Sequence, residues 1–121
     1  MISIHVDTKY IGTQQKSEDS LVYVFSYTVN ITNLSERPMT LKNRYWLITN
    51  GNGEKVEVRG EGVVGEQPTI NPNDTFQYTS ASMLKTQVGS MQGYYEFECT
   101  DKSMYKAPIP VFRLAVPNAL H

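Results

Sequence analysis

Gly60, Gly62 and Gly65 form a G-x-G-x-x-G motif directly after a strand-like run at 55–59. In a dinucleotide-binding fold, this motif needs a helix that begins at its third glycine, because the helix N-terminus supplies unpaired N–H groups for a pyrophosphate. The residues that follow are Glu-Gln-Pro-Thr-Ile-Asn-Pro, which contain two prolines and no helical period. The motif therefore does not indicate a Rossmann site.

Two interpretations of the three glycines remain. Their backbone N–H groups could form an anion-binding nest for a phosphate or pyrophosphate, which needs no helix. Alternatively, the glycines could supply positive φ or close backbone approach where a strand bends away, with the intervening valines filling the mouth of the fold. The second interpretation is favoured, because the flanking glutamates would repel an anion unless Arg44 or Arg59 offset them. Gly60, Gly62 and Gly65 are the candidate binding residues of the chain.

The other residues that could do chemistry are sparse. His5 and His121 are the only histidines, and neither has a Cys or second His at ligand spacing, which argues against zinc. Glu96 and Glu98 share a strand face and could bind a hard divalent cation, but solvated surface residues are the favoured interpretation. No G-x-S-x-G, Walker lysine or Cys–His nucleophile pattern is present. We therefore predict a protein that is not an enzyme and uses no cofactor or resident metal.

Composition narrows the remaining classes. The 121 residues suit one domain, 1–121, large enough for a core without disulfides. A pI of about 6.1 with scattered Lys and Arg disfavours nucleic acid. No apolar run approaches the ~20 residues that span a bilayer, so we expect no membrane insertion and a cytoplasmic location. The single cysteine, Cys99, agrees with a reducing compartment and is interpreted as a small core residue.

The chain reads as a series of strands separated by turns. Every second residue from Leu21 to Ile31 is apolar or aromatic, and the residues between them end in the polar set Ser26, Thr28 and Asn30, which indicates a strand with one face on a core. The double Asn-Gly at 50–53 predicts a type I′ hairpin, and Asn-Pro-Asn-Asp at 71–74 predicts another turn. The remaining expected elements are a strand at 2–11 followed by a polar loop at 12–20, and strands at 39–50, 54–59, 75–80, 94–100 and 105–114.

Seven or eight strands with turns about every ten residues predict an all-β fold, an immunoglobulin-like or fibronectin type III-like antiparallel sandwich. A closed barrel is the alternative. Tyr95, two residues after Gly93, is expected to be the corner tyrosine that ties the preceding loop in immunoglobulin-like domains. Trp46 on the third strand fits the same arrangement.

Five stretches of this chain closely resemble the bacterial ApaG family, in the same order and across essentially the whole length. Two of them are Arg-Tyr-Trp-Leu-Ile-Thr-Asn-Gly-Asn-Gly at 44–53 and the glycine motif with its continuation at 60–68. The others are Tyr-Thr-Ser at 78–80, Gly-Ser-Met-Gln-Gly at 89–93 and Ile-Pro-Val-Phe-Arg-Leu at 109–114. Pro72-Asn73 stands where the family usually has Pro-Gly, and because Asn tolerates positive φ the turn is expected to persist.

The resemblance implies a fibronectin type III-like or immunoglobulin-like sandwich and an association with cobalt tolerance and magnesium efflux. It also implies a glycine motif suspected of binding pyrophosphate, and eukaryotic relatives that look like interaction modules. We therefore predict a binding module that acts through a protein partner, with nucleotide or pyrophosphate binding as the alternative. Its recognition surface is expected where the 60–68 loop meets a turn at 89–93, and a homodimer is possible.

Overall fold

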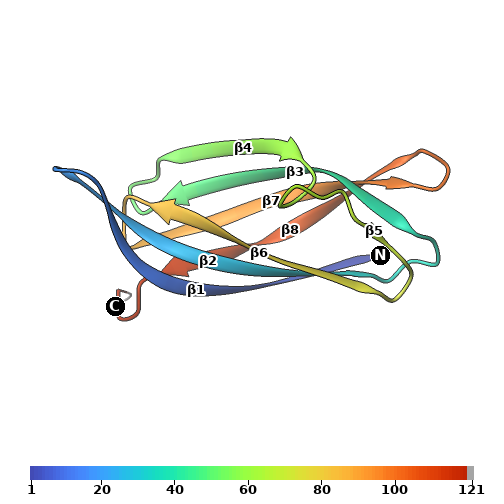
Figure 1. The fold of residues 1–121 in the computed structure, drawn as a ribbon, viewed down its shortest axis with the longest axis horizontal. Helices are drawn as coiled ribbons and strands as arrows, with labels where there is room; N and C mark the ends of the chain where they lie inside the picture. The colour runs from blue at the N-terminus through green and yellow to red at the C-terminus, as the bar shows by residue number, and fades with distance from the viewer. Residues whose placement is uncertain (120–121) are drawn as a thin grey trace.

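The computed structural model describes residues 1–119, which form eight β-strands arranged as two antiparallel sheets packed face to face (Figure 1). This confirms the predicted all-β sandwich. His121 lies outside the described residues. The strands are β1 Ile2–Ser17, β2 Ser20–Asn33, β3 Met39–Asn50, β4 Lys55–Glu61, β5 Thr69–Ile70, β6 Thr75–Leu84, β7 Val88–Cys99 and β8 Met104–Ala115.

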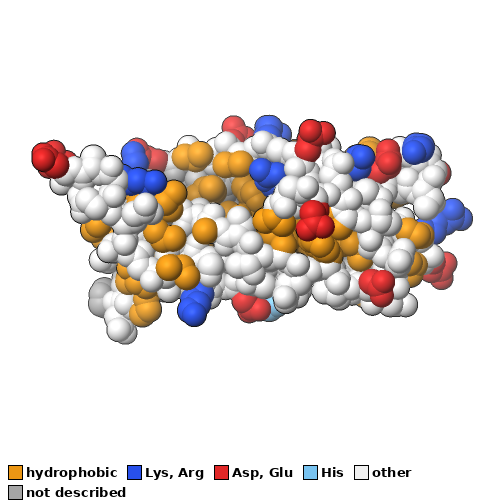
Figure 2. Space-filling view, in the orientation of Figure 1, with side chains coloured by type: hydrophobic (Ala, Val, Ile, Leu, Met, Phe, Trp, Pro, Cys, Tyr) orange, Lys and Arg blue, Asp and Glu red, His pale blue; other side chains and the backbone are white. Residues whose placement is uncertain are grey.

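One sheet has the order β1-β2-β6, and the other has the order β4-β3-β7-β8 with the short β5 added beside β3. The edge strands β6 and β4 lie on the same side of the sandwich, which faces the viewer in Figure 1. Figure 2 shows hydrophobic side chains gathered on this side, between β4 and β6. We call it the open side.

The homodimer expected from the sequence stays a prediction.

The predicted polar loop at 12–20 is wrong, because β1 continues to Ser17 and pairs with β2 almost to the turn. Gln15 lies opposite Leu21, and only residues 18 and 19 form the turn. In Figure 1 this hairpin projects beyond the rest of the sandwich. This two-stranded hairpin is exposed to solvent on both faces, so its residues need not be apolar. Its polar composition was therefore interpreted as a loop although the residues form a strand.

The hairpin between β3 and β4 forms as predicted, but its turn is not type I′. Among its residues only Gly53 has positive φ, at 82°. The N–H of Gly53 donates to the carbonyl of Asn50 at 3.0 Å, and the Asn50 side chain accepts from the N–H of Asn52 and of Glu54. This is a three-residue loop, a turn followed by one left-handed residue. In the 71–74 turn, Asn73 has φ 67°, which confirms that asparagine takes the left-handed position.

The core between the sheets is aromatic. Trp46 contacts Tyr27, Tyr95 and Phe112 edge-on or tilted, with ring centroids 5.5, 6.1 and 5.8 Å away. Tyr95 is fully buried in the middle of β7, and its hydroxyl bonds to that of Tyr78 in the other sheet at 2.5 Å. The predicted corner role of Tyr95 is therefore wrong. Cys99, at the end of β7, is half-buried against the core.

Candidate functional site

Gly60 lies within β4, directly opposite Arg44 of β3. A Cβ atom at Gly60 would come within 2.7 Å of the Arg44 guanidinium carbon. The first glycine of the motif therefore leaves room for an arginine side chain that crosses the inner face of β4.

Gly62 and Gly65 are needed for the shape of the segment that follows β4. Gly62 has φ 63°, and a Cβ atom there would lie 2.1 Å from the carbonyl oxygen of Glu66. Val64 and Gly65 have φ 42° and 80°, and Val63 and Glu66 exchange N–H···O bonds of 2.8 and 2.9 Å around them. Positive φ at both central residues is the signature of a type I′ turn. The structure thus gives each motif glycine a steric or conformational reason.

The amide of Gly62 is already occupied, since it donates to the carbonyl of Lys42 at 2.8 Å. Binding of phosphate by the amides of Gly60, Gly62 and Gly65 stays a prediction. The predicted joint surface with a turn at 89–93 is wrong, because these residues belong to β7. Gly89 pairs with Asn50, at the end of β3 remote from Glu61.

Beneath the glycine segment, between the two sheets, is a polar cavity of about 190 Å³ that we call the Arg44 pocket. Its walls come from both sheets and from the turn that follows β4. The lining residues are Tyr27, Arg44, Trp46, Val63, Val64, Gly65, Tyr78 and Ser80.

Arg44 is held in this pocket by backbone carbonyls. Its Nη1 donates to the oxygens of Glu61 at 3.1 Å and Gly62 at 3.0 Å. Within residues 1–119, the side-chain ion pairs are His5–Asp7 and Arg59–Glu57, so the half-buried Arg44 has no carboxylate within 4.0 Å. A partly desolvated cation without a counter-charge is a favourable place for an anion.

Three tyrosine hydroxyls lie close to this cation. Burial raises the pKa of Tyr27, of Tyr78 and of Tyr95, and in each case the positive charge of Arg44 opposes the shift. The neighbouring Ser80 side chain also lowers the pKa of Tyr27. All three phenols are neutral at neutral pH, so the Arg44 pocket itself is lined by neutral hydroxyls. Glu61 and Glu96 line a neighbouring hollow together with Arg44, but neither forms an ion pair with it within 4.0 Å.

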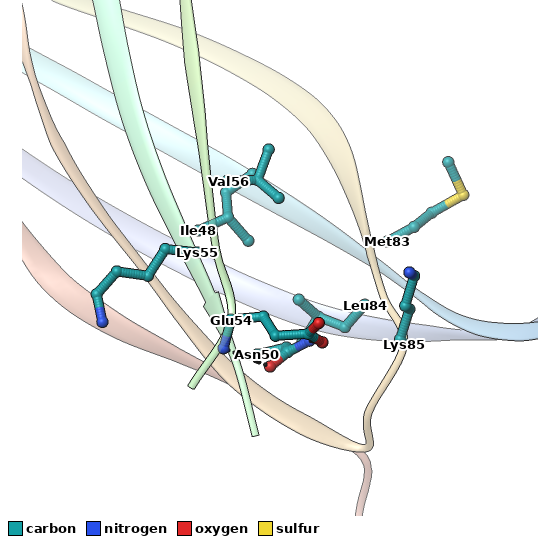
Figure 3. A pocket seen from close by; sticks show the side chains of 8 residues that line it. All are labelled: Ile48, Asn50, Glu54, Lys55, Val56, Met83, Leu84 and Lys85. Carbon is teal, nitrogen blue, oxygen red and sulfur yellow. Dashed lines mark hydrogen bonds between the residues drawn. The ribbon is translucent and has the colours of Figure 1, made fainter. Parts of the chain in front are cut away.

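A second hollow of about 250 Å³ lies on the open side, nearer the 51–53 loop. Figure 3 shows Ile48, Val56 and Leu84 facing it, while the Lys55 side chain extends away. The Asn50 amide donates to the Glu54 carboxylate at 2.8 Å at its rim. Its walls are mostly apolar, which distinguishes it from the Arg44 pocket.

The outer face of the larger sheet carries a row of alternating cations and rings, which we call the tyrosine ladder: Arg59, Tyr45, Tyr94 and Lys106, on β4, β3, β7 and β8. The Tyr45 and Tyr94 rings stack with centroids 4.9 Å apart. The Arg59 guanidinium lies 4.4 Å above the Tyr45 ring, and Lys106 Nζ lies 4.2 Å from the Tyr94 ring. Glu57 accepts a 2.6 Å bond from the Tyr45 hydroxyl, and this bond raises the pKa of Tyr45.

The residues considered for metal binding lie apart. Glu96 accepts a 3.2 Å bond from the Asn43 amide on the outer face, and His5 bonds to Asp7 on the other sheet. Among residues 1–119, no group of three or more His, Cys, Asp or Glu side chains is positioned to hold a metal ion. No helix in the described part of the chain could cross a membrane.

From the sequence, Arg44 was predicted only to offset the charge of the glutamates that flank the glycine motif, and its position in a pocket between the sheets was missed. The signal for its inward position was present, because Arg44 alternates in phase with Trp46 and Ile48, both of which contact the core. A charged residue on the inner face of a strand is unusual and marks a polar site. The tyrosine ladder could not be predicted from the sequence, because its four residues lie on four different strands and only the pairing register of those strands brings them together.

Comparison with known proteins gives a consistent result. A sequence model of the ApaG domain matches residues 13–99. Protein ApaG of Enterobacter sp. (strain 638) is 50% identical over 120 residues, covering 99% of this chain and 95% of the relative. Protein ApaG of Shewanella pealeana is 49% identical, covering 99% and 94%. The names of these relatives state no reaction.

Two solved structures are similar along nearly the whole chain. A structural-genomics target solved by X-ray crystallography is 46% identical with a TM-score of 0.95, covering 99% of this chain and 90% of the other. The putative ApaA protein from Bordetella pertussis is 38% identical with a TM-score of 0.87, covering 98% and 95%.

Proposed function

The chain belongs to the ApaG family, and from this premise we propose that it is a non-enzymatic binding module that recognises a protein partner through the tyrosine ladder. Through this partner the protein would act in the cobalt tolerance and magnesium efflux that the family resemblance implies. A cytoplasmic location is part of the same proposal.

The observation that carries the proposal is the rigid exposure of the ladder. Tyrosine and arginine are the residue types that contribute most to protein interfaces, because they combine large contact area with hydrogen-bonding groups. Stacking, the cation–π contacts and the Glu57 bond fix the orientation of the rings before a partner arrives. Side chains that are already ordered lose less entropy on binding.

The chemistry of the ladder defines the partner. Lys106 forms no ion pair within 4.0 Å among the described side chains, whereas Arg59 is 3.6 Å from Glu57. We therefore expect a protein surface that lays an apolar side chain on the two rings and presents a carboxylate to Lys106.

The test is genetic complementation in a bacterium that lacks the protein and has altered cobalt tolerance. Tyr94→Ser removes the stack, and loss of a central interface tyrosine typically costs about 2 kcal/mol, roughly thirtyfold in affinity. We expect this variant to fail to restore tolerance and Tyr94→Phe, which keeps the ring, to restore most of it. Lys106→Ala should also be defective.

The matched control is Lys9→Ala, an exposed lysine on the other sheet. It makes the same change in charge and should restore tolerance fully. If Tyr94→Ser and Lys106→Ala are expressed, folded and fully active in this assay, the ladder is not the interface.

Phosphate or pyrophosphate binding at the glycine segment is a second candidate, favoured by the position of Arg44 against Gly60. It predicts that pyrophosphate or a dinucleoside polyphosphate shifts the amide resonances of Gly60, Gly62 and Gly65. Unchanged amide resonances at millimolar ligand would exclude it.

A further inference from the structure

We propose that the Arg44 pocket binds one phosphate group, held by the Arg44 guanidinium and the Ser80 and Tyr27 hydroxyls rather than by a nest of glycine amides. This inference is independent of the tyrosine ladder, which lies on the opposite face of the larger sheet. It places the ligand between the sheets, in the space that the glycine motif shapes.

The first argument is charge. Arg44 is half-buried, bonds only to backbone carbonyls through Nη1, and faces no carboxylate within 4.0 Å among residues 1–119. Coulomb interactions are several times stronger at such a site than in water, because the surroundings are less polarisable. An anion that enters the pocket therefore meets a cation that forms no ion pair within 4.0 Å, although Glu61 and Glu96 line a neighbouring hollow with it.

The second argument is the arrangement of donors. Arg44 comes from β3, Tyr27 from β2 and Ser80 from β6, while the turn that contains Gly65 closes the cavity. Donors that reach a cavity from both sheets suit a tetrahedral oxyanion, whereas a carboxylate is planar and is matched by donors in one plane. Arginine is the residue most often used for phosphate recognition.

The third argument is size. Pockets for drug-sized ligands measure about 300–1,000 Å³, whereas this cavity is about 190 Å³. It accepts a phosphate group but not a buried nucleotide, so a larger phosphorylated molecule would leave its remainder outside the cavity.

The fourth argument is the backbone at the entrance. Val64 has φ 42° and its side chain is 54% exposed. A β-branched residue with positive φ is a true outlier, and such strain concentrates at ligand sites. Val63, only 1% exposed, fills the space beneath the same turn. The turn thus buries Val63 and covers the Arg44 pocket while it holds Val64 in a strained conformation.

The test is titration of the full chain with inorganic phosphate at constant ionic strength, followed by amide and arginine side-chain NMR. We expect shifts at Arg44, Ser80 and Gly65. Arg44→Gln should weaken binding at least tenfold, equivalent to about 1.4 kcal/mol. The control Lys9→Gln makes the same change in net charge at an exposed residue of the other sheet and should alter affinity less than twofold.

Gly60→Ala provides a second variant in case Arg44→Gln unfolds. It keeps the charge of the protein but displaces the guanidinium, because the new Cβ would lie 2.7 Å from its carbon. It should also weaken phosphate binding. Equal effects of Arg44→Gln and Lys9→Gln, or acetate binding as tightly as phosphate, would overturn the proposal.

Pyrophosphate separates this site from the nest of glycine amides. If pyrophosphate shifts Gly60 and Gly62 and binds equally well to Arg44→Gln, the amide nest is correct and the Arg44 site is wrong. If neither anion shifts any resonance, both are wrong, while the protein-binding proposal is untouched.

Discussion

Alanine substitution at each of the three motif glycines should give three different stabilities. At Gly65, φ is 80° and an added Cβ would meet no atom within 4 Å, so only the left-handed backbone opposes alanine. That conformation costs an L-residue roughly 1–2 kcal/mol. Gly65→Ala should therefore lower the free energy of unfolding by about that amount.

Gly62→Ala should be the most damaging of the three. It has the same conformational penalty at φ 63°, and its Cβ would lie 2.1 Å from the Glu66 carbonyl oxygen. Because that atom is backbone, the turn must open and lose the pair of bonds between Val63 and Glu66. Each such bond contributes about 0.5–1.5 kcal/mol, so with the conformational penalty the total loss should be roughly 2–5 kcal/mol.

Gly60→Ala should change stability least, by less than about 1 kcal/mol. Its φ is not positive, its neighbour is the end of a flexible arginine, and alanine restricts the unfolded chain more than glycine does. Urea unfolding followed by tryptophan fluorescence measures all three, since Trp46 is the single, buried tryptophan. Equal losses at the three positions would refute the reasoning that each glycine has its own steric role.

Three further predictions concern the core. Tyr78→Phe and Tyr95→Phe should each lower the free energy of unfolding by about 1–3 kcal/mol, because each leaves the other hydroxyl unpaired. In a urea double-mutant cycle, the double variant should lose less than the sum of the two single variants. Additive losses would mean that the 2.5 Å bond is not formed. Burial raises the pKa of Tyr27, Tyr78 and Tyr95 above the ordinary 10.0, so the folded state binds these protons more tightly. The contribution of these tyrosines to stability should therefore be constant below pH 10 and fall as pH rises above it. Tyr95→Phe should flatten that fall in urea midpoints measured from about pH 8 to 11, and an unchanged slope would exclude Tyr95 as a contributor. Gly93→Ala places a Cβ 1.9 Å from the Tyr45 carbonyl oxygen and should force β3 and β7 apart. Thermal unfolding should show a loss of stability of more than about 3 kcal/mol. Wild-type stability of this variant would show that the two strands can separate at little energetic cost.

Strand identity was predictable wherever one face of a strand is buried. From Phe25 to Ile31 the odd-numbered side chains of β2 are buried against the other sheet, which explains the alternation there, although Leu21 is exposed and Val22 is buried. β3 begins and ends at the predicted residues. The outer part of the β1–β2 hairpin has no buried face, so its polar residues resembled a loop. The first residues of β7 resembled a turn because of Gly89 and Gly93, but both glycines are there for close approach to β3.

The candidate site was only half predictable. The glycine motif pointed to the correct segment, and the favoured structural interpretation agrees with the contacts of Gly60 and Gly62. The role of Arg44 depends on pairing across β3 and β4, and that of Ser80 depends on how the two sheets face each other. Neither relation is local in the chain, so no motif could encode it.

The proposal of a protein-binding ladder is tested most directly by photo-crosslinking in living cells. A photo-crosslinking amino acid at position 104, an exposed methionine two residues before Lys106 on β8, is compared with the same amino acid at position 9, on the other sheet. We predict one discrete crosslinked partner from position 104, lost when Tyr94→Ser is added, and none from position 9. The same products from both positions, or a product at 104 that survives Tyr94→Ser, would contradict the proposal.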